Sequence, residues 1–173
     1  MVATVSFVSS LPVAPAFQVM MREFYQIMTD KLVDAGGPFV SPEQLAEDTI
    51  AHIQDVLPPN GRTLLAYGSD GLLLGCGVIK KIRPDAAELK RVYVRPAARG
   101  TGLGRRILEM QIAEARRMGC RSLYADTVKA NTSMLIMFEK LGFSTIPRYP
   151  ENANGAKLEP FMVYQKYVFP DSA

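Results

Sequence analysis

A run of arginine and glycine at residues 99–104 has the residue types that bind an anionic ligand. It reads Arg-Gly-Thr-Gly-Leu-Gly, and Arg105 and Arg106 follow it directly. Glycine lets the backbone approach a ligand closely, and the N–H groups at a helix N-terminus attract phosphate. Charge-assisted hydrogen bonds contribute about 1.5–3 kcal/mol each. The run therefore predicts a phosphate or pyrophosphate site, and a plain turn with solvated arginines is the alternative.

The glycine spacing argues against the two common nucleotide-binding loops. The glycines at 100, 102 and 104 give G-x-G-x-G. A dinucleotide-binding fingerprint needs G-x-G-x-x-G, and Arg105 takes the place of its last glycine. A Walker A loop needs Gly-Lys-Ser/Thr at its end, which this chain also lacks. The spacing thus disfavours a nucleotide-binding oxidoreductase.

The elements on either side of the run place it at a strand-to-helix junction. Residues Glu88–Val94 predict a strand, which should end before Pro96 because proline cannot donate to a sheet. Residues Leu103–Met118 have the spacing of an amphipathic helix. At such a junction several backbone N–H groups can face one anion.

The rest of the chain alternates further strands and helices. Strands are predicted at Thr4–Leu11, Arg62–Tyr67, Leu72–Ile82, Ser122–Val128, Phe143–Ile146 and Glu159–Tyr167. Helices are predicted at Ala16–Leu32, from Ser41 to about Val56, and at Asn131–Leu141, with a surface loop over Pro147–Leu158. This order predicts one α/β domain over residues 1–173 with a mixed, partly antiparallel sheet.

Two segments resemble motifs of the GNAT superfamily of N-acetyltransferases. Residues 94–104 meet every fixed position of its acetyl-CoA signature, roughly V-x-P-x-x-R-G-x-G-x-G/A. Downstream, Asn131 and the sequence Phe-Glu-Lys-Leu-Gly-Phe at 138–143 look like its N-x6-Y-E-K-L-G-F motif. The resemblance implies a GNAT-like fold, in which helices flank the sheet and two central strands splay apart around the cofactor.

The resemblance also implies which residues bind acetyl-CoA, the expected co-substrate, with no metal. The backbone of Val92, Tyr93 and Val94 would pair with the pantetheine arm like an added strand. Asn131 would hydrogen-bond the cofactor, with helix capping as its alternative or additional role, and Phe138 would pack against the pantetheine. The pyrophosphate would be held by Arg99, Gly100, Thr101, Gly102, Leu103, Gly104 and Arg105.

Acetyl transfer to an amine needs the neutral amine, and at pH 7.4 only about one part in a thousand of an ordinary alkylamine is neutral. By resemblance Glu88 is the candidate general base, and a solvated or salt-bridged carboxylate beside Lys90 or Arg91 is its alternative. The family often places a tyrosine general acid where this chain has Phe138, which cannot donate a proton. Tyr149 is one candidate for that role, with an ordinary surface tyrosine as its alternative. The other candidates are Tyr93, Tyr124 and bound water.

Composition limits the other function classes. The chain has 173 residues, a net charge of +3 and no apolar run as long as a membrane span. Its two cysteines, Cys76 and Cys120, lie far apart without a metal-binding pattern, which suits a reducing cytoplasm. The single histidine, His52, is expected at the surface. Basic residues dominate the segment 80–106, but no aromatic base-stacking platform accompanies them, so nucleic acid is disfavoured.

The sequence therefore predicts an N-acetyltransferase that moves an acetyl group from acetyl-CoA to a primary amine by direct transfer. Neither cysteine has a neighbouring base in the sequence, so a cysteine acyl-enzyme is disfavoured. The acceptor would be a small-molecule or peptide amine, without nucleic-acid or membrane partners, and a homodimer stays open. The alternative is a non-catalytic acyl-CoA-binding regulatory module.

Overall fold

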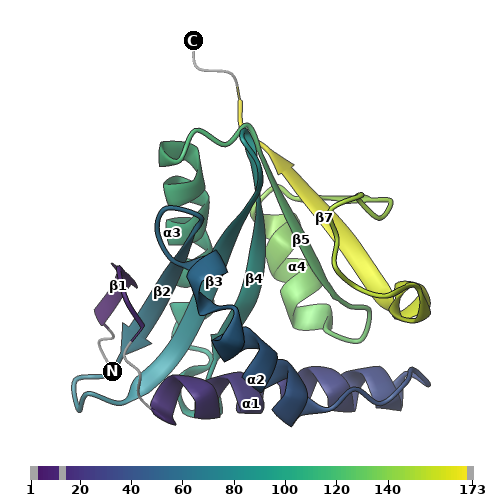
Figure 1. Cartoon of the computed structure of the whole chain (residues 1–173), viewed down its shortest axis with the longest axis horizontal. Coiled ribbons are helices and arrows are strands. Elements are labelled where there is room, and N and C mark those ends of the chain that lie inside the picture. Colours follow the sequence, from purple (N-terminus) through teal and green to yellow (C-terminus); the bar gives the residue numbers. More distant parts are fainter. Residues whose placement is uncertain (1–3, 12–14, 171–173) are drawn as a thin grey trace.

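The protein folds around one seven-stranded sheet with helices on both faces (Figure 1). This computed structural model describes residues 4–11 and 15–170. The sheet order is β1-β2-β3-β4-β5-β7-β6, and every neighbouring pair is antiparallel except β4 with β5. The strands are β1 (Thr4–Val8), β2 (Gly61–Tyr67), β3 (Leu73–Arg83), β4 (Ala86–Val94), β5 (Ser122–Val128), β6 (Ser144–Ile146) and β7 (Met162–Val168).

Two helices cover each face of the sheet. Helices α3 (Leu103–Arg117) and α4 (Thr132–Lys140) pack on one face through a core that includes Leu108 and Phe138. On the other face α1 (Pro15–Asp34) and α2 (Pro42–Ala51) bury Phe17, Met20 and Met21 against the strands. The predicted mixed, partly antiparallel sheet with flanking helices is confirmed.

Several element boundaries were wrong. Strand β1 ends at Val8, three residues early, because a bend at Ser9 and Ser10 takes the chain away from β2. The helix expected to reach Val56 ends at Ala51, where His52 leaves helical geometry with φ −108° and ψ 30°. A 3₁₀ turn at Ile53–Val56 follows and places Val56 in the core.

The segment before β7 also differs from the expectation. A 3₁₀ turn over Ala156–Phe161 takes up the predicted start of the last strand, so β7 begins at Met162. Pro160 lies within this turn and has no N–H to give to a sheet. The expected surface loop over Pro147–Leu158 is partly wrong, since Tyr149 and Asn152 are buried.

Strands β4 and β5 separate after a short parallel pairing. The pairing runs from Ala86 opposite Ser122 to Leu89 opposite Ala125 and then stops. Strand β4 continues to Val94 and stays paired with β3, so its other edge is open beyond Leu89. Figure 1 shows the gap widening toward α1, which crosses the sheet at that end. The expected splay of the central strands is thus confirmed.

A β-bulge in β4 lies just beyond the last paired residue. Lys90 faces Val78 and Tyr93 faces Cys76, so two residues of β4 oppose Gly77 alone. One of them, Arg91, has a φ of 53°, which is unusual for a residue with a side chain. A bulge bends its strand and increases the local twist, which accounts for the separation of β4 from β5.

Close packing of β3 against β4 gives a stability prediction. A Cβ at Gly75 would lie 2.7 Å from the backbone oxygen of Tyr93, which cannot move without disturbing the strand pair. We expect Gly75→Ala to cost about 1–3 kcal/mol, as overpacking does. This corresponds to a melting temperature lower by roughly 2–4 °C per kcal/mol, measured by thermal unfolding. Gly155→Ala is the control, because a Cβ there meets nothing within 4 Å. Equal melting temperatures for the two variants would contradict the prediction.

Candidate active site

A first pocket, here the loop pocket, lies where the glycine-rich loop, the open end of β4, α1 and α4 meet. Its cavity volume is ≈ 420 Å³. Ten of the residues predicted to bind cofactor line it: Val92, Tyr93, Val94, Arg99, Gly100, Gly102, Leu103, Gly104, Arg105 and Asn131. Thus a strand edge, a cationic loop and a helix start surround one pocket.

The loop itself is shaped by glycines in left-handed conformation. Gly100 and Gly102 have φ of 76° and 84°, and Gly102 is the N-cap of α3. Thr101 does not line the loop pocket; its hydroxyl donates to the carbonyl of Ala98 at 2.7 Å and holds the turn. Arg99 is exposed, and its Nε donates to the carbonyl of Val94 at 3.0 Å. The helix N-terminus and this cation are the features that favour an anion.

Asn131 joins this pocket to α1. Its side chain accepts a hydrogen bond from Lys31 Nζ at 2.6 Å and donates to Thr127 Oγ1 at 3.0 Å. It occupies the N-cap position of α4, but its side chain makes no capping hydrogen bond. Burial, and secondarily the charge of Arg99, lowers the pKa of Lys31. Lys31 also lines the loop pocket and adds a second cation from a different element.

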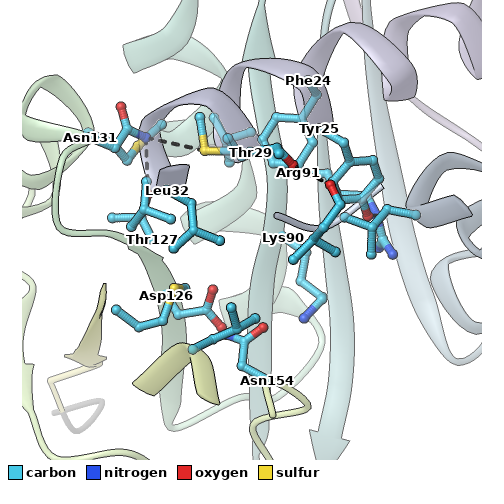
Figure 2. A pocket seen from close by; sticks show the side chains of 18 of the residues that line it. Phe24, Tyr25, Thr29, Leu32, Lys90, Arg91, Asp126, Thr127, Asn131 and Asn154 are labelled. Carbon is cyan, nitrogen blue, oxygen red and sulfur yellow. Dashed lines mark hydrogen bonds between the residues drawn. The ribbon is translucent and has the colours of Figure 1, made fainter. Parts of the chain in front are cut away.

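A second pocket, here the inner pocket, lies between the diverging strands, α1 and the segment before β7 (Figure 2). Its cavity volume is ≈ 360 Å³. Most of its wall is apolar, and Phe24, Met28, Val92, Asn131 and Met134 line both pockets. The two pockets therefore adjoin each other at residues of α1, β4 and the start of α4.

Glu88 is buried and fully engaged. It is 2% exposed, its Oε2 accepts from Lys90 Nζ at 3.0 Å, and its Oε1 accepts from the hydroxyl of Tyr149. Neither Glu88 nor Tyr149 lines the loop pocket or the inner pocket. The structure thus brings the two predicted catalytic residues into direct contact with each other, beside the pockets.

The Glu88–Tyr149 contact extends to a second carboxylate. Asn152 Nδ2 donates to the Tyr149 oxygen at 3.1 Å and to Asp126 Oδ2 at 2.5 Å. Burial, and then the charge of Glu88, raises the pKa of Tyr149, so its proton stays on the hydroxyl. Burial also raises the pKa of Asp126, an effect that Lys90 opposes and Glu88 reinforces. Asp126 lines the inner pocket.

The remaining predicted residues lie at the edges of the site. Phe138 is 3% exposed, packs on Phe143 with ring centroids 4.9 Å apart, and lines the inner pocket. Tyr93 lines the loop pocket, and its hydroxyl donates to Glu23 at 3.4 Å. The Tyr124 hydroxyl accepts from Arg83 at 2.8 Å and lines neither pocket. His52 is exposed, as expected.

Comparison with known proteins identifies the family. The sequence profile described as "Acetyltransferase (GNAT) family" matches residues 21–143. The chain belongs to the GNAT acetyltransferase family. The matched range contains the loop pocket's glycines, both diverging strands and α4.

Individual relatives agree with this assignment. An uncharacterized N-acetyltransferase of Schizosaccharomyces pombe is 32% identical over 96 residues, covering 55% of this chain and 59% of the relative. An IAA acetyltransferase of Azospirillum brasilense is 36% identical over 93 residues, covering 53% and 60%. The chain thus spans about three-fifths of the length of these curated relatives. A solved Salmonella typhimurium structure, titled a putative acetyltransferase with its cofactor acetyl-CoA, superposes with TM-score 0.61 at 20% identity, covering 100% and 97%.

For this GNAT chain, the sequence predicted that methionines and aromatics of the first helix line the core or a substrate pocket, and Phe24 and Met28 do line both pockets. It did not single out Lys31 of the same helix. Asp126 was also missed, although a carboxylate in the otherwise uncharged strand Ser122–Val128 was a usable signal.

Among the described residues, no helix is long and apolar enough to cross a membrane.

The loop geometry predicts that two neighbouring glycines differ in their tolerance of alanine. Gly102 has a φ of 84°, where a side chain is strained by about 1–2 kcal/mol. We expect Gly102→Ala to weaken coenzyme A binding about tenfold, measured by calorimetry, because relief of strain would move the loop amides. Gly104→Ala is the matched control, since its Cβ would make only ordinary contacts at 3.7 and 3.9 Å. Similar affinities for both variants would show that the loop conformation does not govern binding.

Proposed function

We propose that the chain is an N-acetyltransferase that transfers the acetyl group of acetyl-CoA directly to the primary amine of a small molecule. The main support for the proposal is that the loop pocket and the inner pocket adjoin each other, with five lining residues in common, where β4 and β5 separate. One pocket has the features of an anion site, and the other can take a second reactant. The named relatives and the acetyl-CoA-containing neighbour support this pairing.

Acetyl-CoA fits the loop pocket by charge and by backbone chemistry. Its pyrophosphate would lie against the amides of residues 99–105, with Arg99 and Lys31 near it. The open edge of β4 beyond Leu89 supplies unpaired backbone groups to the pantetheine arm, as in strand addition. Asn131 would hydrogen-bond the cofactor where the two pockets join. The acyl end would then reach the inner pocket beside Phe138.

The inner pocket favours a compact acceptor. A volume of ≈ 360 Å³ lies in the range of small-molecule sites, about 300–1,000 Å³. Its apolar wall includes Phe24, Leu32 and Leu89. These features support a small amine with an apolar body in preference to a peptide.

Direct transfer needs two proton movements. A base takes one proton from the acceptor's ammonium group, and the neutral nitrogen attacks the thioester carbonyl. The C–N bond forms and the C–S bond breaks, and the second proton leaves the nitrogen and ends on the coenzyme A thiol. The sequence predicted Glu88 as the base and Tyr149 as the acid, but neither side chain lines the loop pocket or the inner pocket. Their mutual hydrogen bond gives them a common position beside the inner pocket.

The cysteines support direct transfer over a covalent acyl-enzyme. Cys76 and Cys120 are free and buried. Burial raises the pKa of the Cys76 thiol to about 12, and it also raises the pKa of Cys120. A thiol must ionise to act as a nucleophile, so neither is suited to the role. Two free thiols also suit a reducing compartment, which supports our proposal of the cytoplasm.

This cysteine chemistry is testable with a thiol-reactive dye at pH 8. We expect the native protein to react negligibly during an assay, because both thiols are buried and protonated. The denatured protein should react at both cysteines. Intact-mass measurement after incubation with acetyl-CoA alone should show no added acetyl group. Rapid native labelling would contradict the burial and protonation of the two thiols, and an acetylated cysteine would contradict direct transfer.

The proposed activity itself is tested by coenzyme A release. The purified chain, acetyl-CoA and a panel of alkylamines and arylalkylamines are mixed, and the same dye reports the free thiol of the product. We expect amine-dependent release together with acetylated amine detected by mass spectrometry. Binding of acetyl-CoA without release for any amine in the panel would instead favour the non-catalytic acyl-CoA-binding module.

A further inference from the structure

Asp126 occupies the first position of β5 beyond the last residue paired with β4. The pairing ends at Leu89 opposite Ala125, so Lys90 and Asp126 are the next residues on the two strands. Because side chains alternate along a strand, Asp126 lies on the same face as Tyr124, and Lys90 on the same face as Glu88. Glu88 is itself opposite Tyr124. All four therefore share the face that carries α1 and the inner pocket.

The two carboxylates on this face differ in their partners. Glu88 has a cation, Lys90 at 3.0 Å, and its other oxygen accepts from Tyr149. Asp126 forms no ion pair with any described residue, and the side chain that donates to its Oδ2 is the neutral amide of Asn152 at 2.5 Å. Asp126 is half-buried, and a carboxylate removed in part from water is stabilised when a ligand supplies the missing cation.

The two carboxylates also differ in their access to the pocket. Asp126 lines the inner pocket and keeps part of its surface accessible, whereas Glu88 lines neither pocket. Figure 2 shows the side chains of Asp126, Lys90 and Asn154 at one end of the pocket, with Phe24 and Tyr25 of α1 at the other. An apolar body could thus lie against α1 while its polar end meets Asp126.

We propose that Asp126 is the catalytic residue that binds the acceptor's ammonium group and takes its proton, and that the acceptor is a primary amine on an apolar body. This rests on the proposed function. The Asp126 carboxylate first pairs with the ammonium and then receives one proton from it. The neutral nitrogen forms the C–N bond as the C–S bond breaks. The proton on Asp126 is later released to solvent, while the second amine proton ends on the coenzyme A thiol.

Glu88, Tyr149 and Asn152 are then positioning residues for Asp126. Glu88 holds the Tyr149 hydroxyl, and Asn152 connects that hydroxyl to Asp126 Oδ2. The ammonium group of Lys90 forms its ion pair with Glu88. Lys90 is therefore not the ion-pair partner of Asp126. The network fixes the carboxylate at the opening of the two strands.

The pH dependence follows from the groups around Asp126. Burial raises the pKa of Asp126. A higher pKa makes the carboxylate a stronger base for the acceptor's ammonium proton. The titratable and charged groups that face Asp126 or share its pocket are Glu88, Lys90 and Arg91 of β4, Tyr164 of β7, Tyr149 in the segment before β7, and Tyr25 of α1. Among these, Lys90 lowers the pKa of Asp126 and Glu88 raises it.

The first test compares Asp126→Asn with Glu88→Gln in coenzyme A release from acetyl-CoA and 2-phenylethylamine. We expect Asp126→Asn to lower kcat/KM at pH 7 by about 10²–10³, within the range of general base catalysis. The decrease in kcat/KM caused by Asp126→Asn should become smaller as the pH rises. It should also be smaller for a β-fluorinated analogue, because a larger fraction of this less basic amine is already neutral. Glu88→Gln should lower the rate but leave the acidic limb of the pH profile in place.

Controls separate folding from chemistry. Asparagine can still accept from Asn152, so the melting temperature of Asp126→Asn should be close to wild type. Asp70→Asn removes an exposed carboxylate in the turn between β2 and β3, where asparagine can keep the bond to the Leu72 N–H, and should leave the pH profile unchanged. The proposal would be overturned if Asp126→Asn left the pH dependence of kcat/KM unchanged. It would also be overturned if the acidic limb of that pH dependence moved in Glu88→Gln alone.

A binding measurement gives a second readout that does not depend on turnover. Calorimetry with coenzyme A present compares 2-phenylethylamine with the neutral alcohol 3-phenylpropan-1-ol. We expect Asp126→Asn to weaken binding of the ammonium at least tenfold and to leave the alcohol unaffected. Equal effects on the two ligands would contradict an ionic role. If the wild type releases coenzyme A with other amines but neither binds nor acetylates this one, the apolar-acceptor proposal fails while the acetyltransferase function stands.

Discussion

The end of the pairing between β4 and β5 is the constraint on which the rest of the site depends. Beyond Leu89 and Ala125 the two strands part, and the bulge at Arg91 bends β4 away. An open strand edge leaves backbone N–H and C=O groups without partners on a neighbouring strand, so water or a ligand must pair with them. A ligand can pair with this edge like an added strand. The same separation also makes the space that becomes the inner pocket.

Helix α1 lies across the space between β4 and β5 and contacts residues on both sides of it. Arg95, just after β4, bonds Glu23 through Nε and Nη2, both at 2.9 Å. At the other end of the helix, Lys31 bonds Asn131 at 2.6 Å. These contacts connect β4 and the start of α4 across the gap that backbone pairing no longer bridges. The loop pocket and the inner pocket therefore depend on α1 for one wall each.

Local features of the site could be predicted from the sequence, and long-range ones could not. The glycine-rich loop is a contiguous run whose conformation follows from residue type, so its place at the start of α3 was predictable. Tyr149 was not predictable as a buried residue, because its partner Glu88 lies 61 residues earlier in the chain. Asp126 is the one charged residue of its strand, which the sequence shows, but only the strand register places it next to the point where β4 and β5 separate. The predicted end of a helix or strand was wrong where a 3₁₀ turn includes residues with a helical or extended pattern, as at Ile53–Val56.

A crystal structure with a non-transferable acetyl-CoA analogue and an amine would locate both reactants relative to the separated strands. We expect the pyrophosphate at residues 99–105, the pantetheine along Val92–Val94, and the acyl carbonyl between the ends of β4 and β5 that line the pockets. The amine nitrogen should then lie within hydrogen-bond distance of Asp126. A cofactor bound away from the open β4 edge would contradict the account.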